Sequence, residues 1–318
     1  MVAPKFGWFD KILILARARS SRSTQLRILQ TYSKRTPEQK KELDRRIALS
    51  CNAQALSEIP SELVNFLFSP QAMLAHPLLV PFIRPATRLA RANGYDIVGI
   101  PIITSPVLTF GGQAEQLDSG LKVAEIPLGF IFLLREIGRG ILNLHHAIQC
   151  EETDKAESFA DVCSQLSKLI YRPAAEAFNL GQNHFGKTSF SYKLFATHVS
   201  HVLGVFTILH EVCHICKNHN LKPWSHEQIQ EQEFDADIFA VECIFSSKKD
   251  SKMYDQWRNQ MLIYVCDLFS LMEVELNVSG GELNGYPSFD ARRINLLDNF
   301  KANEQVRTAV DKFHKALA

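Results

Sequence analysis

The feature that most constrains this chain is an apolar stretch at residues 200–217 that carries two histidines four positions apart. No proline interrupts the stretch, and its apolar side chains would lie all around a helix, so the pattern predicts a buried helix. On a helix, residues four apart share one face with Cβ atoms about 6 Å apart, so His210 and His214 can direct imidazole nitrogens at one zinc ion. Glu211 would lie beside them, placed to accept a proton from a water that the metal activates.

The third ligand decides which class of zinc site this is, because structural sites use four protein ligands and catalytic sites use three plus water. A continuation with glycine at 217 and histidine at 220 is excluded, because the chain has Lys217 and Asn220. A second helix expected at residues 227–245 offers several acidic ligands instead. These are Glu231, Glu233, Asp235, Asp237 and Glu242.

The two motifs together, H-E-x-x-H and then E-x-x-A-D at residues 233–237, resemble those of the gluzincin zinc metallopeptidases. The resemblance implies that Glu233 is the third ligand and that Asp237 accepts a hydrogen bond from a ligand imidazole. Helical spacing agrees, because Glu233 and Asp237 would share a face, and Ala236 and Ala240 are small enough for close packing against the first helix.

A third segment, residues 286–294, is similar to the H-P-S-x-x-x-R-I segment of the HtpX and CAAX-prenyl-protease type gluzincins. Tyr286 replaces the histidine and Ile294 comes one place late, so the roles of Tyr286 and Arg292 stay open. Those relatives are embedded in membranes, whereas no apolar run here approaches the roughly 18 residues that a span needs. The soluble minigluzincins and the Lit-type phage-exclusion peptidases are therefore the nearer analogues, and the resemblance covers residues 200–297.

The expected fold is α+β and mainly helical, with a small β-sheet above the two zinc-binding helices, as in gluzincins. Residues 1–92 are predicted to form a helical N-terminal region, with helices near residues 7–30, from Thr36 and from Pro60. Residues 93–318 are predicted to form the metallopeptidase core, with strands between residues 95 and 127. By resemblance, the strand at residues 121–126 is expected to be the edge to which an extended peptide adds.

Charge and cysteine content limit the class of partner and compartment. The chain has a formal charge of +1, which gives no reason to expect a nucleic-acid partner, although its first fifty residues carry 12 basic and 4 acidic side chains and could touch a membrane surface. Seven cysteines without a disulfide-like pattern indicate reduced thiols and a cytoplasmic protein. The C-x-x-C pair and the other histidines near the motif are predicted to pack, to lie on the surface or to lie beside the cleft: Cys213, Cys216, His198, His201, His219 and His226.

These patterns predict a zinc-dependent endopeptidase that hydrolyses a protein or peptide substrate. One Zn²⁺ would be held by His210, His214 and Glu233, with Glu211 as the general base and Asp237 behind the ligands. The alternative is a catalytically silent, zinc-stabilised binding or regulatory protein. A coordination position open to solvent would favour the enzyme.

Overall fold

A computed structural model describes residues 30–50, 79–104, 112–149, 190–219, 225–246, 253–279, 283 and 285–317. The helices expected before residue 30 and from Pro60 lie outside the described residues. The expected mainly helical α+β fold with a small sheet is confirmed. The division of the chain at residue 92 stays a prediction.

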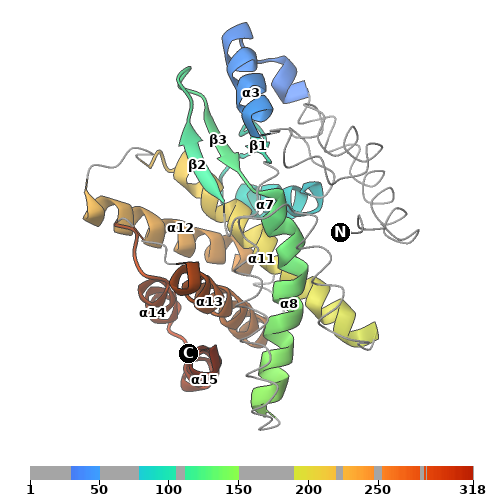
Figure 1. Ribbon diagram of the computed structural model, residues 1–318, viewed down its shortest axis with the longest axis vertical. Helices are drawn as coiled ribbons and strands as arrows, with labels where there is room; N and C mark the ends of the chain where they lie inside the picture. Colours follow the sequence, from blue (N-terminus) through green and yellow to red (C-terminus); the bar gives the residue numbers. More distant parts are fainter. Residues whose placement is uncertain are drawn as a thin grey trace.

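The centre of the molecule is helix α11, Phe190–Cys216, which carries the histidine motif (Figure 1). Helices α7 (Val80–Ala92), α8 (Leu128–Gln149) and α12 (His226–Ser246) all pack against it. Because α11 contacts neighbours on several sides, its residues from Val202 to His214 are buried all around the helix, as the unbroken apolar pattern predicts.

A close contact between α8 and α11 depends on Gly138 of α8. A Cβ atom there would lie only 2.6 Å from the carbonyl oxygen of Ala196 and from Ser200 Oγ, both on α11. The missing side chain therefore lets the two long helices approach at their crossing.

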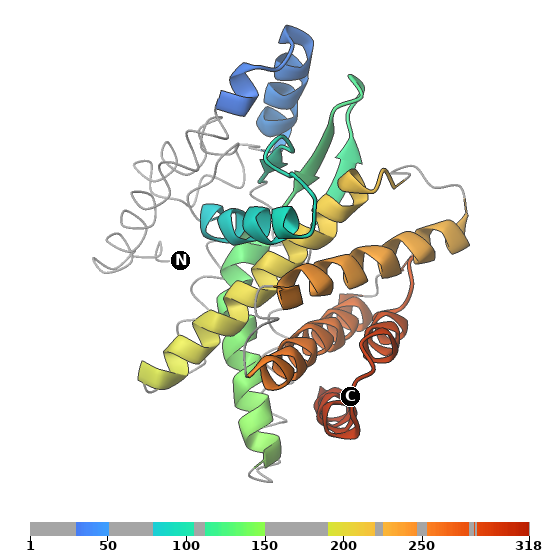
Figure 2. The same ribbon diagram turned by 180° about the vertical axis from the view of Figure 1, so that it is seen from behind.

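The C-terminal helices form a second layer against the first. Helix α13, Tyr254–Ser279, contacts α11 and is covered by α14, Phe289–Asn299, and α15, Glu304–Leu317. Figure 2 shows α12 beside α11, with α14 and α15 on the side of α13 away from α11. Helix α14 also contacts α12, which brings the residues 286–294 segment close to the metal motifs.

The N-terminal helix α3, Pro37–Ser50, begins with the cap that its sequence predicts. Thr36 Oγ1 accepts a hydrogen bond from Gln39 N at 3.2 Å, and Gln39 Oε1 accepts one from Thr36 N at 3.3 Å, which is a capping box. Farther along the helix, Glu42 accepts hydrogen bonds from two backbone nitrogens in residues 118–119. The helix is thereby attached to the turn between two strands.

The sheet has three strands in the order β1-β3-β2, where β1 is Ile102–Ile103, β2 is Gln113–Gln116 and β3 is Lys122–Glu125. Strand β3 pairs parallel with β1 and antiparallel with β2, so it is the central strand. The expectation that residues 121–126 form the edge is therefore wrong, and β2 is an edge in the described part of the sheet. The sequence did not predict β2, because its residues, Gln-Ala-Glu-Gln, show no alternation of apolar and polar side chains. An edge strand that buries little surface does not need this alternation.

One described helix segment, Phe195–Cys216 of α11, is long and apolar enough to cross a membrane by length and composition. This differs from the prediction from the sequence, in which no apolar stretch was long enough to span a membrane. An 18-residue window of this segment is 83% buried inside the structure, as is typical of the core helix of a globular protein.

Candidate metal centre

The two motifs meet where α11 packs against α12. His210, Glu211 and His214 lie on α11, and Glu233 and Asp237 lie on the facing side of α12, all of them buried. Ala236 and Ala240 are fully buried at the same interface, as expected from their small size. The packing of the two helices thus brings the five predicted site residues together.

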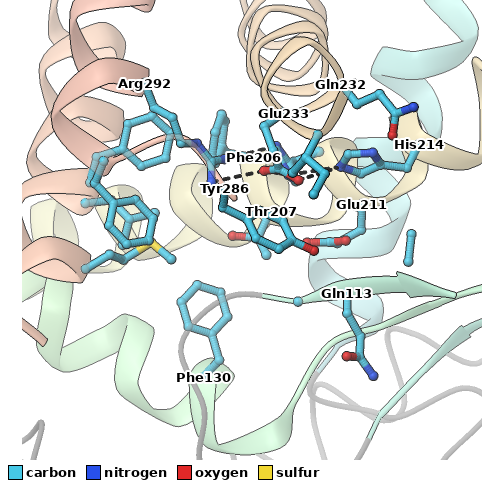
Figure 3. A pocket seen from close by; sticks show the side chains of 18 residues that line it. Gln113, Phe130, Phe206, Thr207, Glu211, His214, Gln232, Glu233, Tyr286 and Arg292 are labelled. Carbon is cyan, nitrogen blue, oxygen red and sulfur yellow. Dashed lines mark hydrogen bonds and ion pairs between the residues drawn. The ribbon is translucent and has the colours of Figure 1, made fainter. Parts of the chain in front are cut away.

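The three predicted ligands surround one point. His210 Nε2 lies 3.3 Å from His214 Nε2 and 3.3 Å from Glu233 Oε2, and His214 Nε2 lies 3.5 Å from Glu233 Oε1 (Figure 3). Zinc bonds of about 2.0–2.1 Å in tetrahedral geometry separate neighbouring ligand atoms by about 3.3–3.4 Å. This buried group of two imidazoles and a carboxylate therefore has the size and chemistry to hold a metal ion such as zinc.

Glu211 is the predicted general base, and its position is set by the start of strand β2. A Cβ atom on Gly112 would lie 2.8 Å from Glu211 Cγ, so only glycine lets the strand come this close. Burial raises the pKa of Glu211 to about 7. A carboxylate with this pKa can both accept and release a proton near neutral pH.

Asp237 supports the first histidine from behind. Its Oδ1 lies 2.9 Å from His210 Nδ1, and the side chain is fully buried. A carboxylate at this nitrogen fixes the ring so that Nε2 faces Glu233 and His214. The structure thus gives Asp237 the position that the resemblance implies.

Arg292 is a site residue whose role the sequence left open. Its Nε and Nη2 donate to the two carboxylate oxygens of Asp237 at 2.8 and 2.6 Å, and its Nη1 lies 3.1 Å from Glu233 Oε2. The guanidinium also stacks on the rings of Phe269 and Phe289, at 4.7 and 5.7 Å from their centroids. One buried arginine therefore holds both carboxylates of α12 in place.

Helix α14 begins in a way that places Arg292 at the site. Ser288 is its N-cap and accepts a hydrogen bond from Ala291 N at 3.1 Å. The first turn of the helix then directs Arg292 towards α12. The two residues that match the P-S-x-x-x-R pattern therefore have structural roles. Ser288 caps the helix, and Arg292 contacts the carboxylates of α12.

The carboxylates and the arginine determine the charges of the site. Burial disfavours a charged His210, but Glu233 and Asp237 outweigh it and raise its pKa to about 10. Burial and the neighbouring His210 lower the pKa of His214 to about 3. Burial also works against a charged Glu233, but Arg292 and His210 hold the pKa of this carboxyl well below its usual range.

Comparison with known proteins agrees with a hydrolytic site. The model of the family described as Peptidase U49 matches residues 149–312, more than half of the 318-residue chain. The chain belongs to the Peptidase U49 family. The matched part includes both metal motifs and Arg292, and the family supports a peptidase with a protein substrate. Searches of curated proteins and of solved structures found no match.

This U49 peptidase has a cavity of about 320 Å³ directly beside the metal motifs. Its polar lining includes Glu211, Gln232, Tyr286 and the predicted ligand side chains, and Gly112, Gln113 and Ala114, at and just before the start of β2, also line it. The remaining lining is mostly apolar and comes from Phe130, Phe206, Ile229, Leu268, Phe269, Met272 and Phe289. A peptide bond could therefore reach the ligands and Glu211 from solvent.

Tyr286, which replaces the histidine of the similar segment, lines the cavity and is half exposed. The residue before it, Gly285, has φ +91°, and a Cβ there would lie 2.4 Å from the ring of His226. His226 at the start of α12 thus packs on the turn that carries Tyr286. A side chain at Gly285 would have to displace the exposed His226 ring and adopt a backbone conformation that favours glycine.

The remaining cysteines and histidines of the motif region are divided between packing and the site. Burial raises the pKa of the Cys213 and Cys216 thiols, the opposite of what a reactive redox pair requires. His198 is exposed, and His201 stacks on Phe82 of α7. His219 differs, because its ring lies directly behind His214, which histidine spacing alone did not indicate.

Proposed function

We propose that this U49 peptidase is a zinc-dependent endopeptidase that uses one zinc ion held by His210, His214 and Glu233. The observation that carries the proposal is the set of three ligand-atom separations of 3.3, 3.3 and 3.5 Å beside an open cavity. Three protein ligands next to a cavity are typical of a catalytic zinc site, whereas a structural site is closed by a fourth. The same observation supports the enzyme over a silent, zinc-stabilised binding protein.

The reaction would be hydrolysis of a peptide bond. A zinc ion in this site would lower the pKa of a coordinated water towards about 7 and polarise the scissile carbonyl. Glu211 accepts the proton as the water oxygen attacks the carbonyl carbon, and it then donates that proton to the nitrogen of the leaving amine as the C–N bond breaks. Its raised pKa of about 7 suits both proton transfers.

The remaining residues hold and present the reacting groups. Asp237 and Arg292 fix the orientation of His210 and Glu233. Strand β2, an edge among the described strands, borders the cavity at Gln113 and Ala114, so an extended substrate can pair with it and cross the metal site. This role moves from the strand at residues 121–126, where the sequence placed it, to β2.

Two substitutions test the proposal in the full-length protein. Glu211→Gln is expected to bind one zinc ion per chain and to lose activity about 10²–10⁴-fold, because the general base is gone but the ligands remain. Glu233→Ala is expected to lose stoichiometric zinc. Zinc is measured by elemental analysis, and activity by mass spectrometry of a complex peptide mixture.

The matched control is Glu231→Gln, which changes an exposed glutamate two residues from Glu233 on the same helix. It is expected to retain both zinc and activity. Undiminished hydrolysis by Glu211→Gln would remove the proposed mechanism, and stoichiometric zinc in Glu233→Ala would remove the proposed ligand.

A further inference from the structure

The end of helix α11 returns the chain towards one of the metal-site histidines. Asn218 has φ +54°, His219 N donates to the carbonyl oxygen of His214 at 2.9 Å, and Asn218 N donates to that of Ile215 at 3.2 Å. These bonds define a Schellman motif, in which asparagine tolerates the left-handed position. The motif places His219 next to His214 although the two are five positions apart in the sequence.

The two rings then meet through their Nδ1 atoms. His219 Nδ1 lies 3.0 Å from His214 Nδ1, and the ring centroids are 5.0 Å apart. Nε2 of His214 faces His210 and Glu233, so a metal in the site would take that nitrogen. A neutral imidazole that binds metal through Nε2 carries its hydrogen on Nδ1, so His214 must donate this hydrogen and His219 Nδ1 must accept it.

The other side of His219 fits this assignment. With Nδ1 as an acceptor, its hydrogen lies on Nε2, which is 2.9 Å from Asp235 Oδ2. The second oxygen of Asp235 accepts a hydrogen bond from Lys217 Nζ at 2.6 Å. Two hydrogen bonds therefore point the same way, from His214 to His219 and from His219 to a carboxylate that Lys217 neutralises.

We propose that His219 is a positioning residue for the metal centre, which orients His214 and is itself fixed by Asp235. The inference rests on the proposed zinc function. His210 contacts the carboxylate of Asp237 directly, whereas His214 reaches a carboxylate through one intervening imidazole. A carboxylate of α12 thus fixes each of the two rings, Asp237 directly for His210 and Asp235 through His219 for His214.

A second metal ion is the main alternative, because Cys213, His219 and Asp235 offer ligand atoms within 4.8 Å of one another. Two contacts weigh against it. The ammonium group of Lys217 already occupies one oxygen of Asp235, and Nδ1 of His219 faces His214. The two readings differ in the number of zinc ions that the chain binds.

Three variants of His219 separate the roles of its two nitrogens. In His219→Asn the amide oxygen can replace Nδ1 as the acceptor for His214. In His219→Gln the amide group is near the place of Nε2, and His219→Ala offers neither. The zinc Kd is measured by competition with a chromophoric chelator, and the d–d absorption of the cobalt-substituted protein reports on ligand geometry.

Loss of the acceptor is expected to raise the zinc Kd about 10–100-fold in His219→Ala and His219→Gln, as for other residues behind a metal ligand. His219→Asn should stay within about threefold of the unchanged protein and keep its cobalt spectrum. Urea unfolding of the zinc-free variants measures any loss of stability separately.

Equal zinc affinities and cobalt spectra in all three variants and the unchanged protein would overturn this inference alone. Equal weakening in all three, in step with their loss of stability, would assign His219 a packing role and overturn it too. Two zinc ions per unchanged chain, one of them lost in His219→Ala, would establish the second metal site instead. An unchanged protein that binds no zinc would overturn the proposed function together with this inference.

Discussion

Replacing Arg292 with lysine keeps one positive charge in the site but removes the planar group that holds two carboxylates. Arg292 donates two hydrogen bonds to Asp237, at 2.6 and 2.8 Å, and lies 3.1 Å from Glu233. An ammonium group is a point charge and can keep one of these three contacts. Hydrogen bonds to charged groups contribute about 1.5–3 kcal/mol each, so losing two should lower the free energy of unfolding by about 3–6 kcal/mol.

The same substitution should also weaken zinc binding. Asp237 orients His210 at 2.9 Å and loses its fixed position when the guanidinium is removed. Losing such support raises a metal Kd about 10–100-fold, which corresponds to about 1.4–2.7 kcal/mol. Urea unfolding of the zinc-free protein measures the first effect, and competition with a chelator measures the second.

Arg293→Lys is the matched control, because Arg293 is the next residue on α14 and equally buried. It donates to Ser270 and pairs with Asp290, and neither is a predicted metal ligand. We expect it to lower stability and leave the zinc Kd unchanged. If Arg292→Lys binds zinc as tightly as the unchanged protein, or Arg293→Lys weakens zinc equally, the clamp assigned to Arg292 is refuted.

Two further predictions concern the cavity wall and a buried ion pair. In Gly112→Ala the new Cβ would start 2.7–2.9 Å from three atoms, including Glu211 Cγ, and restoring ordinary contacts near 3.5 Å shifts the general base by about 0.7 Å. We expect kcat to fall about 10–100-fold with zinc stoichiometry unchanged, so full activity on the peptides cleaved by the unchanged protein would contradict the geometry. Burial disfavours a charged His145, but Asp267 at 2.7 Å outweighs it and raises the pKa of His145. A raised pKa gives stability that is complete below about pH 6.5 and is lost as the pH rises through the folded-state value. His145→Gln should therefore cost about 1–3 kcal/mol near pH 6 and less near pH 9 in urea unfolding.

The helix and the close grouping of the metal motifs could be predicted because both depend on local spacing. His210 and His214 share a face wherever that segment is helical, and Glu233 and Asp237 do so on the next helix. Small residues such as Ala236 on the second helix already indicated that the two helices can pack closely. These features follow from periodicity and do not depend on the rest of the chain.

The residues that orient the predicted ligands could not be predicted in the same way, because their contacts depend on how elements distant in the sequence pack. Arg292 lies 55 positions from Asp237 in sequence, and nothing near it indicates which carboxylates it will meet. His219 had a usable signal, since asparagine at position 218 directly after an apolar helix favours the turn that sends the next residue back. The polar strand β2 shows no apolar alternation that would have predicted it. The edge of the sheet was therefore predicted at the strand that is now β3.

The separation of these contacts along the chain has a consequence for synthesis. His210 to Glu233 emerge from the ribosome together, but the arginine that neutralises their carboxylates follows His210 by 82 positions. Until α14 has been made and has docked, Glu233 and Asp237 lack the guanidinium that holds them, and closing so long a loop is slow relative to local helix formation. The complete site therefore forms only after the residues up to the end of α14 have been synthesised and this helix has docked against α12.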